Sequence, residues 1–246
     1  MLGFRTKLPV TDEQRLWIDN GFERLSRLLG RSRIVDARVI LPIAEYFPDP
    51  YDATDEAVDV LFQRVCGYMQ VDERQIDLEV FPDEAHELHS VVPFWRGDTG
   101  GIAGLYISAT DQSRLVIAIK SSKLKNPLAV VATLAHELAH VILLGGSLID
   151  RESPDMEPLT DLTTVFLGMG IFTANAAVQF EQHQDVRSQG WSIQRLGYLS
   201  EEMFGYALAK FANERGEDRA EWKKYLSTNV AAYYKQSSKW LSQNAP

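Results

Sequence analysis

Apolar residues recur with the spacing of helices through most of the chain. Residues 11–29 and 54–69 have an apolar side chain at every third or fourth position, the period of an amphipathic helix. Thr11 is suited to cap the first of these helices, and Gly30 follows its last residue. Similar patterns predict that the last third of the chain is mainly helical, over residues 159–180, 200–213 and 219–241.

Shorter segments rich in β-branched residues predict strands in the first half of the chain. Residues 33–43 alternate in part between apolar and polar side chains, and residues 76–81 form a short apolar run. Residues 105–109 and 114–120 flank a polar Thr-Asp-Gln-Ser turn, which is typical of a β-hairpin. We therefore expect an α+β fold, with a small mixed or antiparallel sheet packed on a helix.

The pattern changes near residue 120. Helices and strands alternate before it, whereas only helices follow it. The first of these helices begins at Asn126 and Pro127, since asparagine caps helices and proline is tolerated in their first turn. We expect an α/β lobe at residues 1–120 and a helical lobe at residues 121–246, which together form one catalytic unit.

A five-residue HExxH pattern on this helix has the chemistry of a zinc site. His136 and His140 are four positions apart, so both rings lie on one face of a helix and can bind one ion at about 2.0–2.1 Å. Glu137 lies roughly 100° around the helix from His136. There its carboxylate can take a proton from a metal-bound water. The flanking residues are apolar, so we expect the histidines to be buried, where imidazoles without partners would be costly.

A catalytic zinc needs a third protein ligand and keeps its fourth position for water. Glu157 follows after a Gly-Gly turn and a polar loop, and Pro158 restricts it to the first turn of the next helix. Asp161 can accept the second ring hydrogen of a zinc-bound histidine, most simply His136, or can interact with the dipole of its own helix. Three acidic residues remain alternative third ligands: Glu152, Asp155 and Asp161.

The two patterns together, His136-Glu137-xx-His140 and Glu157-xxx-Asp161, resemble the gluzincin metallopeptidases, the group that includes thermolysin. The resemblance covers only this short stretch of the chain. It implies that Glu157 is the third zinc ligand and that Asp161 supports a ligand histidine.

The resemblance also implies a zincin-like fold, in which an edge strand of the sheet holds the peptide substrate. By that analogy residues 105–109 or 114–120 would line the cleft. Pro158 departs from the family pattern, which places the ligand inside its helix.

Gluzincins also use a later histidine, tyrosine or arginine to stabilise the oxyanion of the tetrahedral intermediate. His183 and Tyr206 are the preferred candidates here, before Arg187 and Tyr198. A second pair of histidines flanks Glu87-Leu88 with the wrong spacing, and we expect a surface loop for this pair, His86 and His89.

Charge and composition indicate which partners and which cellular location to expect. The net charge of −9 and the pI of about 5.1 argue against a nucleic-acid partner. Cys66 is the only cysteine and the N-terminus has no long apolar run, so we expect a cytoplasmic protein. Polar residues interrupt residues 162–180, so a buried helix is expected there rather than membrane insertion.

These observations predict a zinc-dependent hydrolase that cleaves peptide bonds in peptide or protein substrates. Zn²⁺ would be bound by His136, His140 and Glu157, and Glu137 would act as general base. The alternative is a metal-binding regulatory or protein-interaction module that keeps the metallopeptidase fold without turnover.

Overall fold

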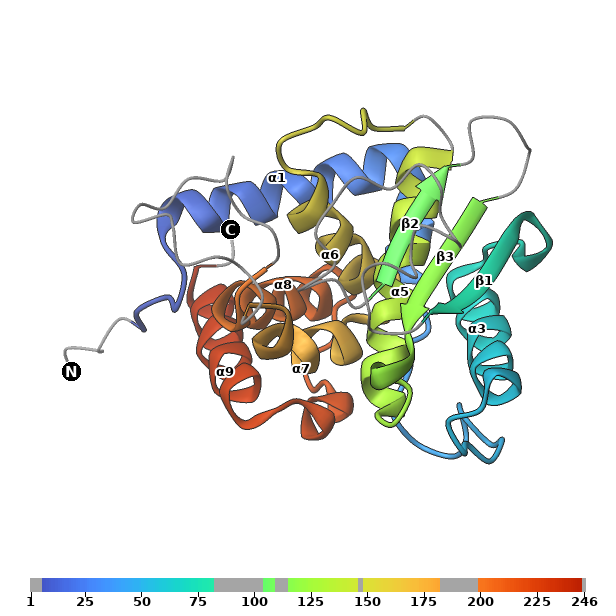
Figure 1. Cartoon of the computed structure of the whole chain (residues 1–246). Coiled ribbons are helices and arrows are strands. Elements are labelled where there is room, and N and C mark those ends of the chain that lie inside the picture. The colour runs from blue at the N-terminus through green and yellow to red at the C-terminus, as the bar shows by residue number, and fades with distance from the viewer. Residues whose placement is uncertain (1–5, 82–103, 109–114, 146–147, 182–198, 245–246) are drawn as a thin grey trace. The chain divides into compact units, whose positions relative to one another are not determined.

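The structure is a computed structural model, which describes residues 6–81, 104–108, 115–145, 148–181 and 199–244. Figure 1 traces its elements along the chain. The chain divides into two compact units. The first comprises Met1–Leu41, Pro154–Val178 and Ser192–Pro246, and the second comprises Pro42–Ser153 and Gln179–Trp191. Residue 120, where the sequence pattern changes, lies inside the second unit.

The first unit is built from helices. Their bounds are α1 (Asp12–Leu29), α2 (Arg31–Val35), α6 (Met156–Phe166), most of α7 (Gly170–Glu181), α8 (Glu201–Glu214) and α9 (Thr228–Gln243), with a short 3₁₀ helix at Glu221–Tyr225. The expected cap of α1 is confirmed: the Thr11 hydroxyl accepts from the Gln14 amide, and the Gln14 side chain accepts from the Thr11 amide. α1 packs against α6 and α8, and α8 lies alongside α9 (Figure 1).

Residues 33–43 do not form the expected strand. Residues 31–35 form α2, and the segment after it is irregular. Its backbone groups have other partners: Arg215 Nη1 donates to the carbonyl oxygens of Ile34, Val35 and Ala37, and the Ile40 amide donates to Gly168. Carbonyl groups that already accept these hydrogen bonds do not need a neighbouring strand as a partner.

The single helix expected over residues 159–180 is two helices, α6 and α7. Gly168 lies between them with a φ of 86°, a conformation that favours glycine. A Cβ at this position would come within 2.3 Å of the Arg38 carbonyl oxygen. The break at Gly168 therefore results from backbone geometry and from a close approach of a distant segment.

The second unit contains the sheet and the helix with the HExxH pattern. Its elements are α3 (Asp55–Met69), β1 (Ile76–Phe81), β2 (Gly104–Ser108), β3 (Leu115–Lys120) and α5 (Pro127–Gly145), with 3₁₀ helices at Glu73–Gln75 and Ser121–Lys123. β3 pairs in parallel with β1 and antiparallel with β2, so the strand order is β1-β3-β2. α5 packs against β2, β3 and α3.

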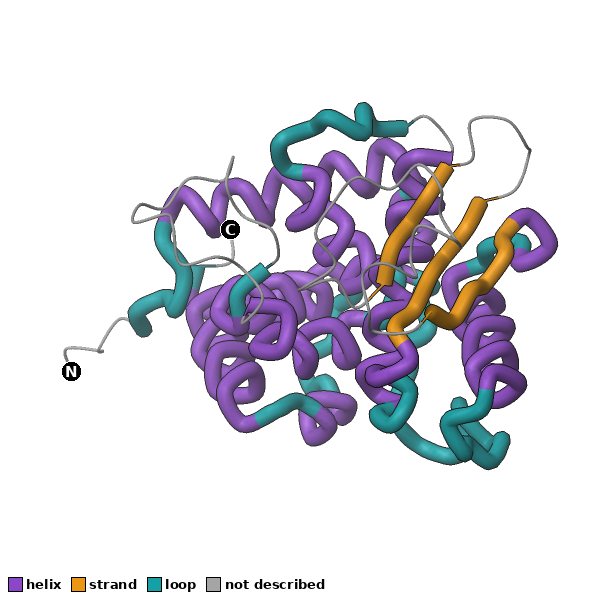
Figure 2. The backbone as a smooth tube through the Cα atoms, in the orientation of Figure 1, coloured by secondary structure: helices purple, strands orange, loops and turns teal. Residues whose placement is uncertain are grey.

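The expected α+β class with a zincin-like sheet is wrong. In the part of the chain that the structure describes, helical residues far outnumber strand residues, and Figure 2 shows how far helices, in purple, predominate. β1 joins the sheet through a parallel pair, which the hairpin pattern did not indicate. β3 is the central strand, so residues 114–120 do not offer the free edge that the resemblance would place beside a substrate.

α5 is long and apolar enough to cross a membrane, judged by length and composition alone. The core helix of a soluble protein meets the same criterion, and 67% of the most apolar window of α5 is buried. Its centre carries two histidines and a glutamate, which would be expensive in a lipid bilayer. These features favour a core helix.

Candidate metal centre

The HExxH residues lie in the middle of α5, whose start follows the sequence prediction. The Ala129 amide donates to Asn126 Oδ1 at 3.2 Å, so Asn126 caps the helix directly before Pro127. His136 is 3% exposed, Glu137 6% and His140 7%. Three ionisable side chains are thus buried within five positions of an otherwise apolar helix.

The two imidazoles lie together on one face of α5. Their ring centroids are 4.9 Å apart and their planes are inclined by 80°. One possible ligand atom from each of His136, His140 and Glu157 lies within 4.8 Å of the other two. Of the described residues, these three form the group of histidine, cysteine and acidic side chains that could hold a metal ion.

Glu157 is the second residue of α6, and Pro158 is the third. This confirms the prediction that proline confines the carboxylate to the first turn. The position is compatible with proline because the amide groups of the first turn have no partner within the helix. The departure from the family pattern therefore does not prevent Glu157 from joining the group.

The alternative third ligands have other surroundings. Glu152 is exposed in the loop before α6. Asp155 forms an ion pair with Arg24, with Oδ2 3.2 Å from Nη1. Asp161 lies deeper in α6 and is 2% exposed. None of the three belongs to the group that could hold a metal, whereas Glu157 does.

Asp161 does not lie in the first turn of α6, so the helix-dipole explanation for it is not supported. Its Oδ2 accepts a hydrogen bond of 2.9 Å from the Leu199 amide. This bond uses one of the two carboxylate oxygens, each of which has two lone pairs. The role of Asp161 in supporting a histidine stays a prediction.

Of the four residues predicted to stabilise the oxyanion, the structure describes one, Tyr206. Tyr206 lies on α8, 1% exposed, and its hydroxyl donates to Asp19 Oδ1 at 2.9 Å. Burial and the nearby Asp19 carboxylate raise the pKa of Tyr206. This contact accounts for Tyr206 without a catalytic role. The remaining histidines and oxyanion candidates lie outside the described residues: His86, His89, His183, Arg187 and Tyr198.

Cys66 has the features of a core residue. It is fully buried on α3, and burial raises the pKa of its thiol to about 12. A thiol with such a pKa is almost entirely protonated at neutral pH, so it is a poor nucleophile and a poor metal ligand.

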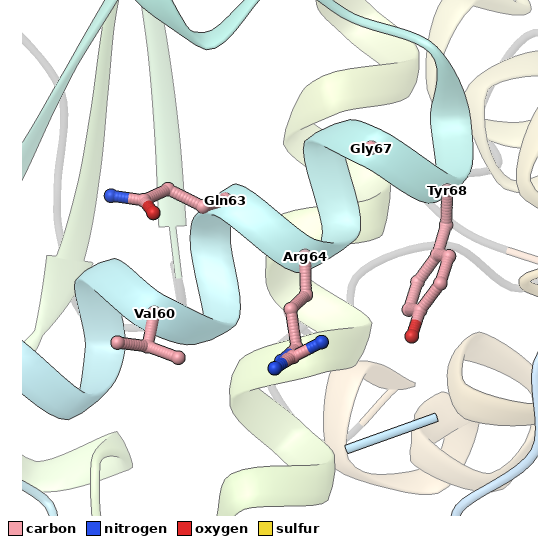
Figure 3. A pocket seen from close by; sticks show the side chains of 5 residues that line it. All are labelled: Val60, Gln63, Arg64, Gly67 and Tyr68. Atoms are coloured by element: carbon pink, nitrogen blue, oxygen red, sulfur yellow. The ribbon is translucent and has the colours of Figure 1, made fainter. Parts of the chain in front are cut away.

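An open hollow of about 480 Å³ is lined by five residues of α3: Val60, Gln63, Arg64, Gly67 and Tyr68 (Figure 3). Two of its polar side chains, Arg64 and Tyr68, already have partners. Arg64 binds the Asp49 carboxylate, and this hydrogen bond lowers the pKa of Asp49. The Tyr68 hydroxyl donates to the Tyr46 carbonyl oxygen. The hollow contains no histidine, cysteine or carboxylate among its lining residues, and it does not compete with the metal centre.

Thr133 is a buried polar residue that the sequence analysis did not single out. It is 3% exposed and precedes His136 by one helical turn on α5. The sequence could have pointed to Thr133 through its spacing from the HExxH residues, because residues three and four positions apart share a helix face.

No protein-family description, no curated protein and no solved structure matches the chain.

Proposed function

We propose that the chain is a zinc-dependent hydrolase that cleaves peptide bonds in peptide or protein substrates. The observation that carries the proposal is the approach of His136, His140 and Glu157 to within 4.8 Å, with Glu137 buried on the same helix as the two histidines. A cytoplasmic location and the lack of a nucleic-acid partner stay predictions.

The donor set fits zinc. Two imidazole nitrogens and one carboxylate oxygen are the ligands of many catalytic zinc sites. Ligands about 2.1 Å from a tetrahedral ion lie about 3.4 Å from one another, so a separation within 4.8 Å needs only small side-chain rotations. The carboxylates of Glu157 and Glu137 would balance the two charges of Zn²⁺. A formally neutral group is less costly to bury than an uncompensated ion.

Glu137 is the residue that supplies proton transfer. A zinc ion bound here would lower the pKa of a coordinated water to about 7 and polarise the scissile carbonyl. Glu137 directly follows His136 on the helix, so its carboxylate would lie beside a bound ion but off the ligand row. It accepts a proton from the attacking water and delivers it to the nitrogen of the leaving amine. His136, His140 and Glu157 orient this exchange by fixing the position of the ion.

The decisive variant is Glu137→Gln, which keeps the size of the side chain but cannot accept a proton. We expect it to keep about one zinc ion per chain and to lose cleavage by about 100-fold or more. Elemental analysis measures the zinc, and mass spectrometry of a digested peptide pool measures cleavage. Glu152→Gln, which removes an exposed carboxylate, is the matched control and should cleave like the parent. Parental cleavage by Glu137→Gln would disprove the mechanism.

The alternative, a metal-binding module without turnover, is favoured by one observation. The Tyr206 hydroxyl already donates to Asp19, so this preferred oxyanion donor is engaged elsewhere. Zinc at one ion per chain with no cleavage of any peptide in the pool would select this alternative over the peptidase.

A further inference from the structure

The position of Glu157 depends on how α6 begins. Glu157 lies in the first turn of this helix, and Asp155 is the N-cap residue. The Leu159 amide donates to the Asp155 carbonyl oxygen at 3.0 Å. This bond closes the first helical turn, with Glu157 at its middle. A contact that holds Asp155 therefore also restricts the backbone of Glu157.

The Asp155 side chain contacts another helix instead of capping its own. An N-cap aspartate usually accepts from the amide of the second or third helical residue. The third residue here is Pro158, which has no amide hydrogen. Among the described residues, the Asp155 side chain makes no capping bond to α6, and its Oδ2 lies 3.2 Å from Arg24 Nη1 on α1. The carboxylate thus ties the start of α6 to a helix of the same unit.

Two apolar contacts also hold α6 against α1. A Cβ added to Gly21 would come within 2.4 Å of Leu162 Cδ2, so the glycine makes room for this leucine. The ring centroids of Phe22 and Phe166 lie 6.1 Å apart. These contacts act on the middle and the end of α6. Arg24 supplies the contact at its start, where the proposed third ligand lies.

We propose that Arg24 is a positioning residue for the metal centre, which holds Glu157 where it can meet the two histidines. Arg24 acts through Asp155 and is not itself a ligand. The inference rests on the proposed function, of which it needs only the zinc site. A role through charge alone would have the opposite sign, because a nearby cation repels Zn²⁺ and its removal would strengthen zinc binding.

The test measures the Kd for zinc by competition with a chromophoric chelator. Arg24→Gln should raise this Kd about 3- to 5-fold, the range that a partly exposed ion pair can supply. Arg24→Lys can still pair with Asp155 and should recover most of the parental affinity. Arg31→Gln is the matched control, because Arg31 forms a 3.2 Å ion pair with Glu214 between α2 and α8, which carry none of the proposed ligands. It removes the same charge and should bind zinc like the parent.

A second comparison shows whether Arg24 acts through Asp155. In a protein that already carries Asp155→Asn, Arg24→Gln should cause no further rise in Kd, because the contact is already lost. Thermal unfolding of the zinc-free proteins should give Arg24→Gln and Arg31→Gln similar midpoints, since each loses one partly exposed ion pair. A much lower midpoint for Arg24→Gln would overturn the inference, because weaker zinc binding would then follow from a weakened fold.

The remaining outcomes separate the inference from the proposed function. A Kd in Arg24→Gln at or below the parental value would overturn the inference alone. An equal rise in Arg31→Gln, or a further rise when Arg24→Gln is added to Asp155→Asn, would do the same. The expected rise in a protein that cleaves no peptide would support the inference and remove the peptidase. A parent that binds no zinc would remove the proposed function, and the inference with it.

Discussion

The hydroxyl of Tyr206 is one of several groups that contact Asp19. It donates to Oδ1, while Arg15 Nη1 lies 3.1 Å from Oδ2 and Lys210 Nζ lies 3.8 Å from Oδ1. Burial keeps the phenol protonated, since it raises the pKa of Tyr206 further above neutrality. This small network gives α1 and α8 a polar contact inside an otherwise apolar unit.

Tyr206→Phe separates a structural role from a catalytic one. Removing the hydroxyl takes one hydrogen bond from a charged acceptor, so we expect the free energy of unfolding to fall by about 1–3 kcal/mol. We expect kcat/KM to be unchanged, whereas loss of an oxyanion donor would lower kcat about 100- to 1,000-fold. Urea unfolding and peptide cleavage measure the two effects. A large fall in kcat without a fall in stability would restore Tyr206 as a catalytic residue.

At the scale of elements, glycines set how closely helices approach in the first unit. A Cβ at Gly205 on α8 would lie 2.4 Å from the Tyr233 Cβ and 3.0 Å from the backbone of α9. The near atoms belong to backbone or to its first side-chain carbon, so they cannot rotate away. Gly67 on α3 is the opposite case, with nothing within 4 Å of an added Cβ.

Gly205→Ala should therefore destabilise the protein although alanine favours helices. Overpacking costs about 1–3 kcal/mol. The higher helix propensity of alanine returns about 1 kcal/mol. We expect a net loss of up to about 2 kcal/mol in the free energy of unfolding. Gly67→Ala, the control, should gain about 0.5–1 kcal/mol because it adds propensity without a clash. Equal shifts in the two unfolding midpoints would contradict the role assigned to Gly205.

At the scale of the whole molecule, a bound metal ion would contribute to stability. The chain has one cysteine, so no intramolecular disulfide constrains it. A ligand that binds only the folded chain stabilises it in proportion to the logarithm of its concentration over Kd. The proposed site meets this condition, because Glu157 joins the two histidines of α5 only in the folded chain.

Removal of zinc should lower the thermal unfolding midpoint of the parent. With free zinc at about 1,000 times Kd, the contribution is about 4 kcal/mol. For a chain of this size that corresponds to a shift on the order of 10 °C. Calorimetry with and without a chelator measures the shift. His140→Ala lacks one ligand, so its midpoint should not respond to the chelator. A parent whose midpoint is equally insensitive would show that no metal supports the fold.

The sequence by itself determined the features that depend on near neighbours in the chain. Thr11 and Asn126 cap α1 and α5 because a side-chain oxygen reaches amide groups two or three residues away. The spacing of His136 and His140 placed both rings on one face for the same reason, because helix geometry fixes positions four residues apart. Pro158 likewise placed Glu157 in the first turn of α6.

Only the tertiary structure decided the features that depend on distant partners. Residues 33–43 are not a strand because Arg215, far along the chain, binds their carbonyl groups. The parallel pairing of β1 with β3 left no local signal, since it joins strands separated by β2. Asp155 stayed an alternative to Glu157 as third ligand until its ion pair with Arg24 was known. Local spacing fixes which side chains share a face, whereas packing between distant segments fixes which of them meet.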